Sequence, residues 1–135
     1  MPTDPAVVRA VLDTNAVVSA ILSPFGAPAR LLNLVLAGPV LPCYDGRILA
    51  EYRDVLARPK FAIAPRVSMA LVSRIAHIGL AVTPTPVTVW LPDNDDRAFV
   101  EVAEAAAATL VTGNPRHFPA IQRATSVAAF LTQLT

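Results

Sequence analysis

The sequence predicts one α/β domain over residues 1–135, in which helices cover both faces of a parallel sheet. Short runs of strand-forming residues alternate with helical patterns along the chain, and this alternation is typical of parallel sheets joined by helical crossovers. The composition agrees, since 54% of the residues are hydrophobic and the mean hydropathy is +0.52, as expected for strands buried on both sides. A length of 135 residues suits a single domain with one core.

The N-terminal half of the chain predicts two strands and three helices. The β-branched run "VVRAVLD" favours a buried parallel strand. Pro28 can open a helix that Gly38 closes. Asp45 is the expected N-cap of an amphipathic helix that Pro59 ends. The expected strands are residues 7–13 and 40–44, and the expected helices are residues 15–22, 28–38 and 45–59.

The C-terminal half continues the alternation around one long connector. Residues 86–96 predict an extended connector, and the helix after it has an acidic first turn that suits the helix dipole. Ser126 is the expected N-cap of the last helix. The expected helices are residues 65–78, 95–108 and 126–134, and the expected strands are residues 80–84 and 109–114.

Several general features bear on where the protein works. No apolar run reaches the roughly 18 residues that suggest a membrane span, so we expect no membrane contact. The start "MPTDPAVV" has no basic region of the kind that opens a signal peptide. The single cysteine, Cys43, excludes an intrachain disulfide and suits a reducing compartment. We therefore expect a cytoplasmic protein.

The formal net charge is only +1, but the charges are unevenly distributed. A basic stretch precedes an acidic one, which suits a polyanion held against metal ions. The alternative is that these are ordinary solvated helix faces. The basic residues of interest are Arg47, Arg53, Arg58 and Lys60, and the acidic ones are Asp93, Asp95 and Asp96.

Acidic residues stand at three separate places where the predicted fold could bring them together. Asp13 ends the first strand, although it could simply cap the next helix. Glu51 stands at the edge of an apolar helical stripe, although it could be a solvated flank. Asp93 and Asp96 lie three residues apart at a helix start, where capping and the dipole are the alternative explanation. Carboxylates without clustered Cys or His favour Mg²⁺ or Mn²⁺, which supports phosphodiester hydrolysis.

Four segments together resemble the successive motifs of PIN-domain ribonucleases, and most closely the VapC-like toxins of bacterial toxin–antitoxin systems. They are "VLDTNAVVSAILSPFGAPARLL", "ILAEYRDVLARPKF", "LPDNDDRAFVEVA" and "LVTGNPRHFP". The resemblance covers residues 7–132 and implies a three-layer α/β/α sandwich with a central parallel sheet. It matches Asp13, Glu51 and Asp96 to the three catalytic, metal-binding acids. Asp93 and Asp95 lie beside the third acid and are expected to share in metal binding.

The resemblance also implies roles for polar residues around these acids. Asn15 and Thr112 match positions that order the site or its water. Asn114 matches a fourth position that is Asp in many PIN domains, and the form "TGNxxHF" resembles a recurrent variant of this branch. His117 is close enough in sequence to contact a phosphate or carry a proton, although a loop-capping role is the alternative. The other expected RNA contacts are Arg47, Arg53, Arg58 and Lys60.

The function that the resemblance implies is Mg²⁺- or Mn²⁺-dependent hydrolysis of RNA by a type II toxin. Its expected partners are the RNA substrate and a small antitoxin protein, and the VapC-like resemblance favours a homodimer. One alternative is a catalytically weak or inactive nucleic-acid-binding module, since Asn114 adds no negative charge. Another is a different doubly wound protein, such as a phosphate-transfer domain, that uses Asp13 but does not need Glu51.

Overall fold

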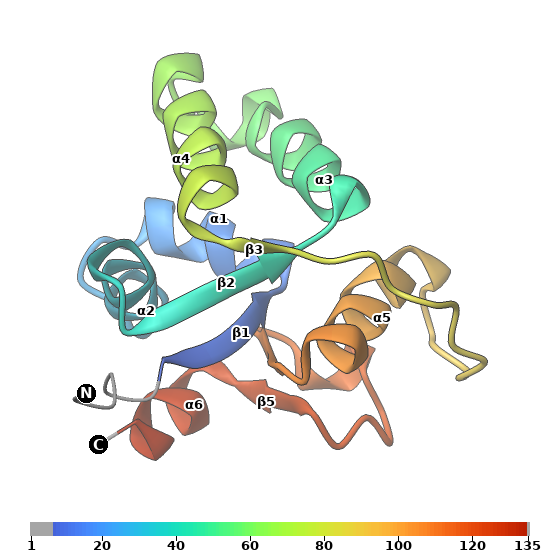
Figure 1. The fold of residues 1–135 in the computed structure, drawn as a ribbon. Coiled ribbons are helices and arrows are strands. Elements are labelled where there is room, and N and C mark those ends of the chain that lie inside the picture. The colour runs from blue at the N-terminus through green and yellow to red at the C-terminus, as the bar shows by residue number, and fades with distance from the viewer. Residues whose placement is uncertain (1–6, 135) are drawn as a thin grey trace.

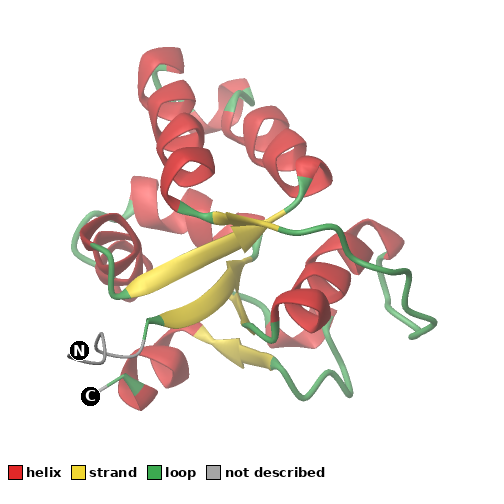
Figure 2. Ribbon diagram, viewed as in Figure 1, coloured by secondary structure: helices red, strands yellow, loops and turns green. Residues whose placement is uncertain are grey.

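A parallel sheet of five strands forms the centre of the computed structural model, which describes residues 7–134 (Figures 1 and 2). The strand order is β3-β2-β1-β4-β5, and every pairing between neighbours is parallel. The predicted α/β class is therefore confirmed. The strands are β1 (Val8–Leu12), β2 (Val40–Tyr44), β3 (Leu80–Ala81), β4 (Thr109–Thr112) and β5 (Ala124–Ser126).

Strand β1 lies at the middle of the sheet and determines where a site can form. It pairs with β2 on one edge and with β4 on the other, where Leu12 aligns with Val111. The sheet grows outward in both directions from β1, so the strand order reverses there. Crevices at the carboxyl ends of parallel strands form at such reversal points, and Asp13 directly follows this end of β1.

The helices form layers on both sides of the sheet. Helix α5 packs against β1, β2 and β4, whereas α2 contacts both α1 and α6, and these three helices also contact strands of the sheet. Helices α3 and α4 pack together and contact β2, at the top of Figure 1. The bounds are α1 (Thr14–Leu22), α2 (Ala27–Ala37), α3 (Gly46–Leu56), α4 (Pro65–Ile78), α5 (Arg97–Ala106) and α6 (Val127–Gln133).

Local sequence signals explain most helix ends. Pro28 stands in the first turn of α2, and Gly38 caps the other end with a φ of 112°, a left-handed conformation that glycine adopts without strain. The carboxylate of Asp45 accepts a hydrogen bond from the Ile48 N–H at 3.1 Å. The Ser126 hydroxyl likewise accepts from the Ala129 N–H at 3.1 Å. These predicted caps are confirmed.

Two expected elements differ from the structure, and the structure contains one strand that the sequence did not predict. The strand expected at residues 80–84 is only Leu80–Ala81. The helix expected at residues 95–108 is Arg97–Ala106, because the acids before it form a separate 3-10 turn, Asn94–Asp96. Strand β5 was not expected, because its three residues carry little local signal and are ordered by pairing with β4.

The core lies between the helices and both faces of the sheet. Its largest fully buried side chains include Tyr52, Phe99, Phe130 and Leu31. Within residues 7–134, no single helix is long and apolar enough to cross a membrane. Helices α1 and α2 meet that test only as a pair, and the pair is bent by 102°.

Candidate active site

The five acids that the sequence analysis selected line one crevice of about 450 Å³ at the carboxyl end of the sheet. We call it the acidic crevice. It lies at the reversal of strand order, between residues that follow β1, the middle of α3 and the turn that precedes α5. The acids are Asp13, Glu51, Asp93, Asp95 and Asp96.

Asp13 forms the floor of the acidic crevice. It occupies the N-cap position of α1, but its side chain makes no capping hydrogen bond, so the capping alternative does not explain it. Its Oδ2 instead accepts a hydrogen bond of 2.7 Å from the Thr112 hydroxyl on β4. Asp13 is 4% exposed. Burial raises its pKa, and the hydrogen bond from Thr112 opposes that rise without cancelling it.

Glu51 reaches the acidic crevice from the middle of α3. Its carboxylate accepts a hydrogen bond from the Thr14 hydroxyl, at the start of α1. Burial raises the pKa of Glu51, Thr14 opposes the rise, and the charge of Asp13 adds to it. Glu51 is therefore partly buried and held by a partner, which is not how a solvated flank residue behaves.

Asp96 is the carboxylate with the least compensation. It is 8% exposed, and its Oδ2 is the one buried side-chain nitrogen or oxygen of the described residues that lacks a hydrogen bond. His117 Nδ1 lies 3.5 Å from this oxygen, a distance that suits an ion pair with a protonated imidazole. Burial, followed by the charge of Asp13, raises the pKa of Asp96 to about 7.

The two neighbouring acids are more exposed and belong to the turn itself. The Asp93 carboxylate accepts a hydrogen bond of 2.9 Å from the Asp95 N–H. The charge of Asp93 also helps to raise the pKa values of Glu51 and Asp96. Asp93 therefore caps the turn and adds negative charge to the crevice.

The donor set suits a hard divalent cation. Three carboxyls of the crevice have raised pKa values, which is the result when negative charges share a partly dehydrated space. Within the described chain, no three His, Cys, Asp or Glu side chains stand close enough together to enclose a metal ion. Mg²⁺ keeps several of its waters and needs only one or two carboxylates as direct ligands, so this spacing is compatible with it.

The polar residues near β4 form a chain that ends on Asp13. The Asn114 N–H donates to the Thr112 hydroxyl at 3.0 Å, and that hydroxyl donates to Asp13. The Asn15 Oδ1 accepts from the Gly113 N–H at 2.9 Å, which ties α1 to the loop after β4. Asn15 lines the crevice, whereas Asn114 does not.

The basic residues expected to contact RNA are divided by the fold. Arg58 and His117 line the acidic crevice, and Lys60 lies over the ring of Phe61, which also lines it. Arg53 lies elsewhere, at a small cavity between α3 and α4. Arg47 contacts the carboxylates of Asp45 and Glu101, each at 2.8 Å, at a neighbouring cavity that shares Glu51 and Asp95 with the crevice.

Two contributors were missing from the predicted set of site residues. Thr14 is one of them, and its sequence context gives no sign that it bonds to Glu51. Glu101 is 4% exposed and fully hydrogen-bonded. The signal that could have suggested its burial is its position between Val100 and Val102 in the helix pattern.

Comparison with known proteins places this geometry in a family. The fold is similar to that of VapBC2 from Rickettsia felis, solved bound to a promoter DNA fragment, with a TM-score of 0.59, 17% identity, and coverage of 88% of this chain and 98% of that one. It is also similar to DNA-bound VapBC from Salmonella typhimurium, with a TM-score of 0.60, 19% identity, and coverage of 89% and 98%. For PAE2754 from Pyrobaculum aerophilum the TM-score is 0.63, with 14% identity and coverage of 95% and 90%.

Sequence comparison adds a relative and a family. An uncharacterized protein of Methanocaldococcus jannaschii, MJ1680, is 24% identical over 110 residues, which cover 79% of this chain and 71% of the relative. The family model of the PIN domain matches residues 9–116, a range that contains every acid of the crevice. The chain therefore belongs to the PIN domain family, whose members are nucleases.

Proposed function

We propose that this protein is a Mg²⁺- or Mn²⁺-dependent endoribonuclease that acts as the toxin of a type II toxin–antitoxin pair. The observation that carries the proposal is that the buried Oδ2 of Asp96, beside Asp13 and Glu51 in one crevice, accepts no hydrogen bond. A divalent cation would offset the burial that raises the pKa values of all three carboxyls, and the neighbouring negative charges that add to the rise at Glu51 and Asp96. Family membership supports the nuclease part of the proposal.

The chain's own residues have distinct parts in the proposed reaction. Asp13, Glu51 and Asp96 would hold the ion, one or two of them directly and the rest through its waters, and Asp93 and Asp95 would help in the same way. When bound, such an ion supplies an activated water and stabilises charge on the phosphate oxygens. Thr112 orients Asp13, and Thr14 orients Glu51, through hydrogen bonds that fix the carboxylate planes. These two hydroxyls keep the carboxylates in the orientation that a bound ion would need.

The substrate would lie across the crevice with its backbone near the basic residues of the rim. Arg58 and His117 line the crevice itself, and Lys60 stands next to it on Phe61. Contacts of this kind hold phosphates and do not read base sequence. A cytoplasmic location would give the enzyme access to cellular RNA.

The toxin assignment rests on resemblance to the motifs of VapC-like toxins and on the shared fold with VapBC structures. As a toxin, the protein would be silenced by a small antitoxin that covers the acidic crevice, and it would form a homodimer. Co-expression with the product of a small adjacent gene tests this part. Growth arrest by the toxin alone, relieved by that product, is the expected result, and arrest that persists contradicts the pairing.

RNA cleavage by matched variants tests the catalytic assignment. Asp13→Asn keeps the size of the side chain and removes its charge, so we expect cleavage in Mg²⁺ or Mn²⁺ to fall by about 100-fold or more. Asp54→Asn is the control, because Asp54 lies on α3 with its side chain 76% exposed. Single-stranded DNA assayed in parallel tests the preference for RNA. Equal cleavage by the wild type and Asp13→Asn contradicts the site.

The neutral Asn114 and the spacing of the acids favour a second candidate function, a nucleic-acid-binding module with weak or no catalysis. A Mn²⁺ titration separates the two. Saturable Mn²⁺ binding that Asp13→Asn abolishes supports the enzyme. RNA binding without measurable Mn²⁺ binding supports the module.

A further inference from the structure

A long connector leads from β3 to the 3-10 turn Asn94–Asp96, which we call the acidic turn, without pairing as a strand. Residues 82–91 have no regular secondary structure, and a loop of this length is usually functional when it is ordered. The side chains of Val87 and Val89 pack toward the core, whereas Thr88 and Trp90 are exposed. The connector therefore alternates like a strand, although it lies over α5 and not along a strand.

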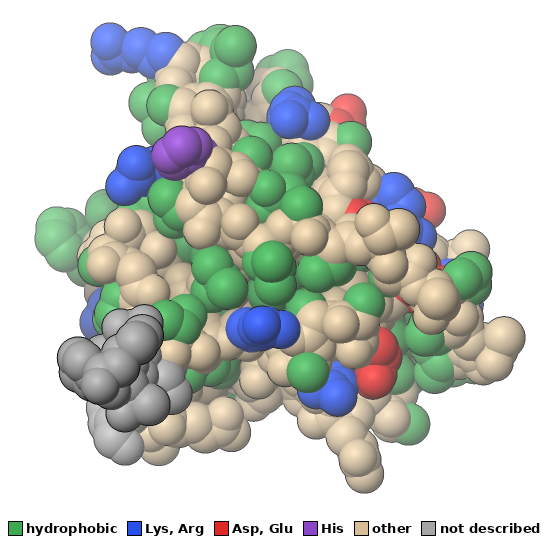
Figure 3. Space-filling model, in the orientation of Figure 1, with side chains coloured by type: hydrophobic (Ala, Val, Ile, Leu, Met, Phe, Trp, Pro, Cys, Tyr) green, Lys and Arg blue, Asp and Glu red, His purple; other side chains and the backbone are tan. Residues whose placement is uncertain are grey.

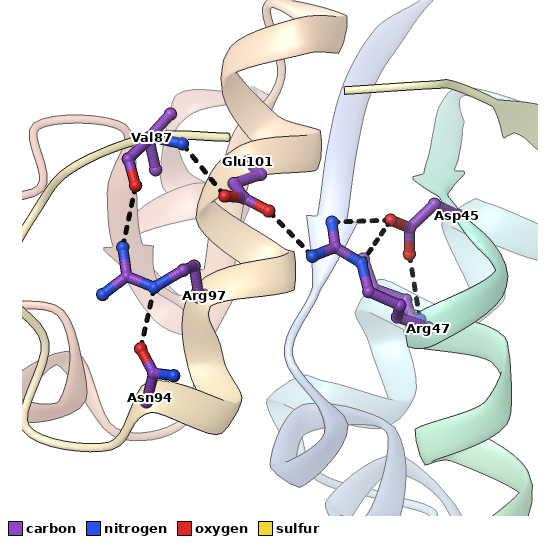
Figure 4. A network of polar contacts seen from close by, with 7 residues as sticks. Asp45, Arg47, Val87, Asn94, Arg97 and Glu101 are labelled. Carbon is purple, nitrogen blue, oxygen red and sulfur yellow. Dashed lines mark hydrogen bonds and ion pairs between the residues drawn. The ribbon is translucent and has the colours of Figure 1, made fainter. Parts of the chain in front are cut away.

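Two charged side chains of α5 make hydrogen bonds to the connector backbone of the kind that a neighbouring strand would otherwise make (Figure 4). Glu101 accepts a hydrogen bond of 2.9 Å from the Val87 N–H. Arg97, one turn earlier on the same helix face, donates to the Val87 carbonyl at 2.9 Å and to the Val89 carbonyl at 2.8 Å. Both backbone groups of Val87 are thus satisfied by side chains.

The same pair reaches the acidic turn and helix α3. Arg97 also donates to the Asn94 side-chain oxygen at 2.8 Å, next to the acids of the turn. The second carboxylate oxygen of Glu101 accepts from Arg47 at 2.8 Å. Arg47 also contacts Asp45, the N-cap of α3. Figure 4 shows Arg47 between the two carboxylates, one from each helix.

The charge state of Glu101 is consistent with a fixed, ionised link. Burial alone would raise its pKa, but the hydrogen bonds from Arg47 and the Val87 N–H outweigh burial and leave the pKa lowered. Charge-assisted hydrogen bonds of this kind are the stronger and more directional ones.

We infer that Glu101 is a positioning residue that, with Arg97 and Arg47, sets the acidic turn opposite Glu51. The connector and the turn lie on the α5 side of the crevice, and Glu51 lies on α3. Glu101 is the group that joins these two sides, through Val87 and through Arg47. The crevice geometry then depends on a residue that does not line the crevice. The inference about metal binding rests on the proposed function, whereas the inference about the connector does not.

Glu101→Gln tests the inference, with Glu104→Gln as the matched control. Glu104 lies one turn later on α5 and pairs with Arg123 at 3.2 Å, with its side chain 50% exposed. We expect Glu101→Gln to speed amide hydrogen exchange across residues 82–93 by roughly tenfold. We also expect Glu101→Gln to weaken Mn²⁺ binding several-fold when binding is measured well below the unfolding temperature of the variant. Glu104→Gln should change neither quantity.

The two measurements keep this inference separate from the proposed function. If the wild type binds no Mn²⁺, the proposed function fails, and faster exchange in Glu101→Gln still supports the link to the connector. If exchange across residues 82–93 is unchanged, or if Mn²⁺ binds the variant as tightly as the wild type, the positioning role is overturned. Arg97→Lys, which keeps the charge and loses the forked donor, serves if Glu101→Gln does not fold.

Discussion

Asp96 and Glu101 lie five residues apart, are almost equally buried, and have opposite environments. Asp96 is 8% exposed and has an Oδ2 that accepts no hydrogen bond, and its pKa is raised to about 7. Glu101 is 4% exposed, both of its oxygens accept hydrogen bonds, and its pKa is lowered. Burial is costly for both carboxylates, but hydrogen bonds outweigh it at Glu101, whereas His117 offsets it only in part at Asp96.

The difference separates a structural carboxylate from a candidate ligand. On the face drawn in Figure 3, Asp and Glu side chains adjoin Lys and Arg side chains, which is the usual arrangement on a protein surface. An uncompensated carboxyl group inside a crevice destabilises the fold, and functional sites are where such groups gather.

The largest effect is expected from removing the compensated carboxylate. Glu101→Ala leaves the Val87 N–H without its acceptor and leaves Arg47 with Asp45 alone, so we expect the free energy of unfolding to fall by about 3 kcal/mol. Urea denaturation near neutral pH measures it. Glu104→Ala, on the exposed side of the same helix, should stay within about 0.5 kcal/mol of the wild type. A similar small loss of unfolding free energy in both variants would mean that Glu101 stabilises the fold no more than an exposed glutamate does.

Removing the carboxylate of Asp96 should instead raise the free energy of unfolding. The pKa of Asp96 is about 7 in the folded state against 3.8 in the unfolded chain. The folded state therefore holds more protons between these values, and the free energy of unfolding falls as the pH rises from about 4 to about 7. Asp96→Asn removes this penalty, so we expect a gain on the order of 2 kcal/mol at about pH 8 in EDTA.

The pH and the metal provide the controls for this variant. At about pH 4 most of the advantage of Asp96→Asn should be lost, because the carboxyl is protonated in the folded state and nearly half protonated in the unfolded state. Excess Mn²⁺ should stabilise the wild type and not the variant, because a ligand stabilises only the state that binds it. Thermal unfolding measures both comparisons, and a gain that is independent of pH would contradict the assignment.

A smaller effect on the free energy of unfolding is expected from removing the Thr112 hydroxyl, which donates a hydrogen bond to Asp13. Thr112→Val keeps the shape of a fully buried side chain and removes the hydroxyl that donates to Asp13 and accepts from the Asn114 N–H. We expect a loss of about 1 kcal/mol. Thr109→Val, at the other end of β4, is the matched control for urea denaturation. Equal losses in the two variants would show that the hydroxyl of Thr112 does not support the site.

The smallest effect is expected at Asn114, which does not line the acidic crevice. Asn114→Asp adds one carboxylate beside Thr112, so we expect Mn²⁺ affinity to rise about threefold. Asn114→Ala, which lacks a side-chain oxygen, is the reference in the same calorimetric titration. Equal affinities for the two variants would place residue 114 outside the influence of the metal.

The sequence predicted the parts of the site that depend on local signals. Short buried runs located β1 and β4, and parallel pairing of those strands then brings Asp13 beside Thr112. Asp13, Glu51 and Asp96 could be selected because each stands at an element boundary or at the edge of an apolar stripe, and because the motif order is specific. Their roles as metal ligands stay predictions.

The sequence could not distinguish residues whose surroundings come from distant segments. Glu101 and Glu104 stand three residues apart in one alanine-rich helix, and only the connector and Arg47 make Glu101 different. Arg47 was expected to contact RNA because the sequence shows its positive charge but does not show that it contacts Glu101. The extended connector was predicted, but its attachment through side chains of α5 was not.

The central position of β1 has a consequence for synthesis of the chain. Asp13 is made early, but its N–H donates to Val111 and its carboxylate accepts from Thr112. Asp96 also precedes β4 in the chain. A ribosome must therefore translate past β4 before the acids can occupy their final positions. The acidic crevice therefore cannot be complete until nearly the whole domain has been made.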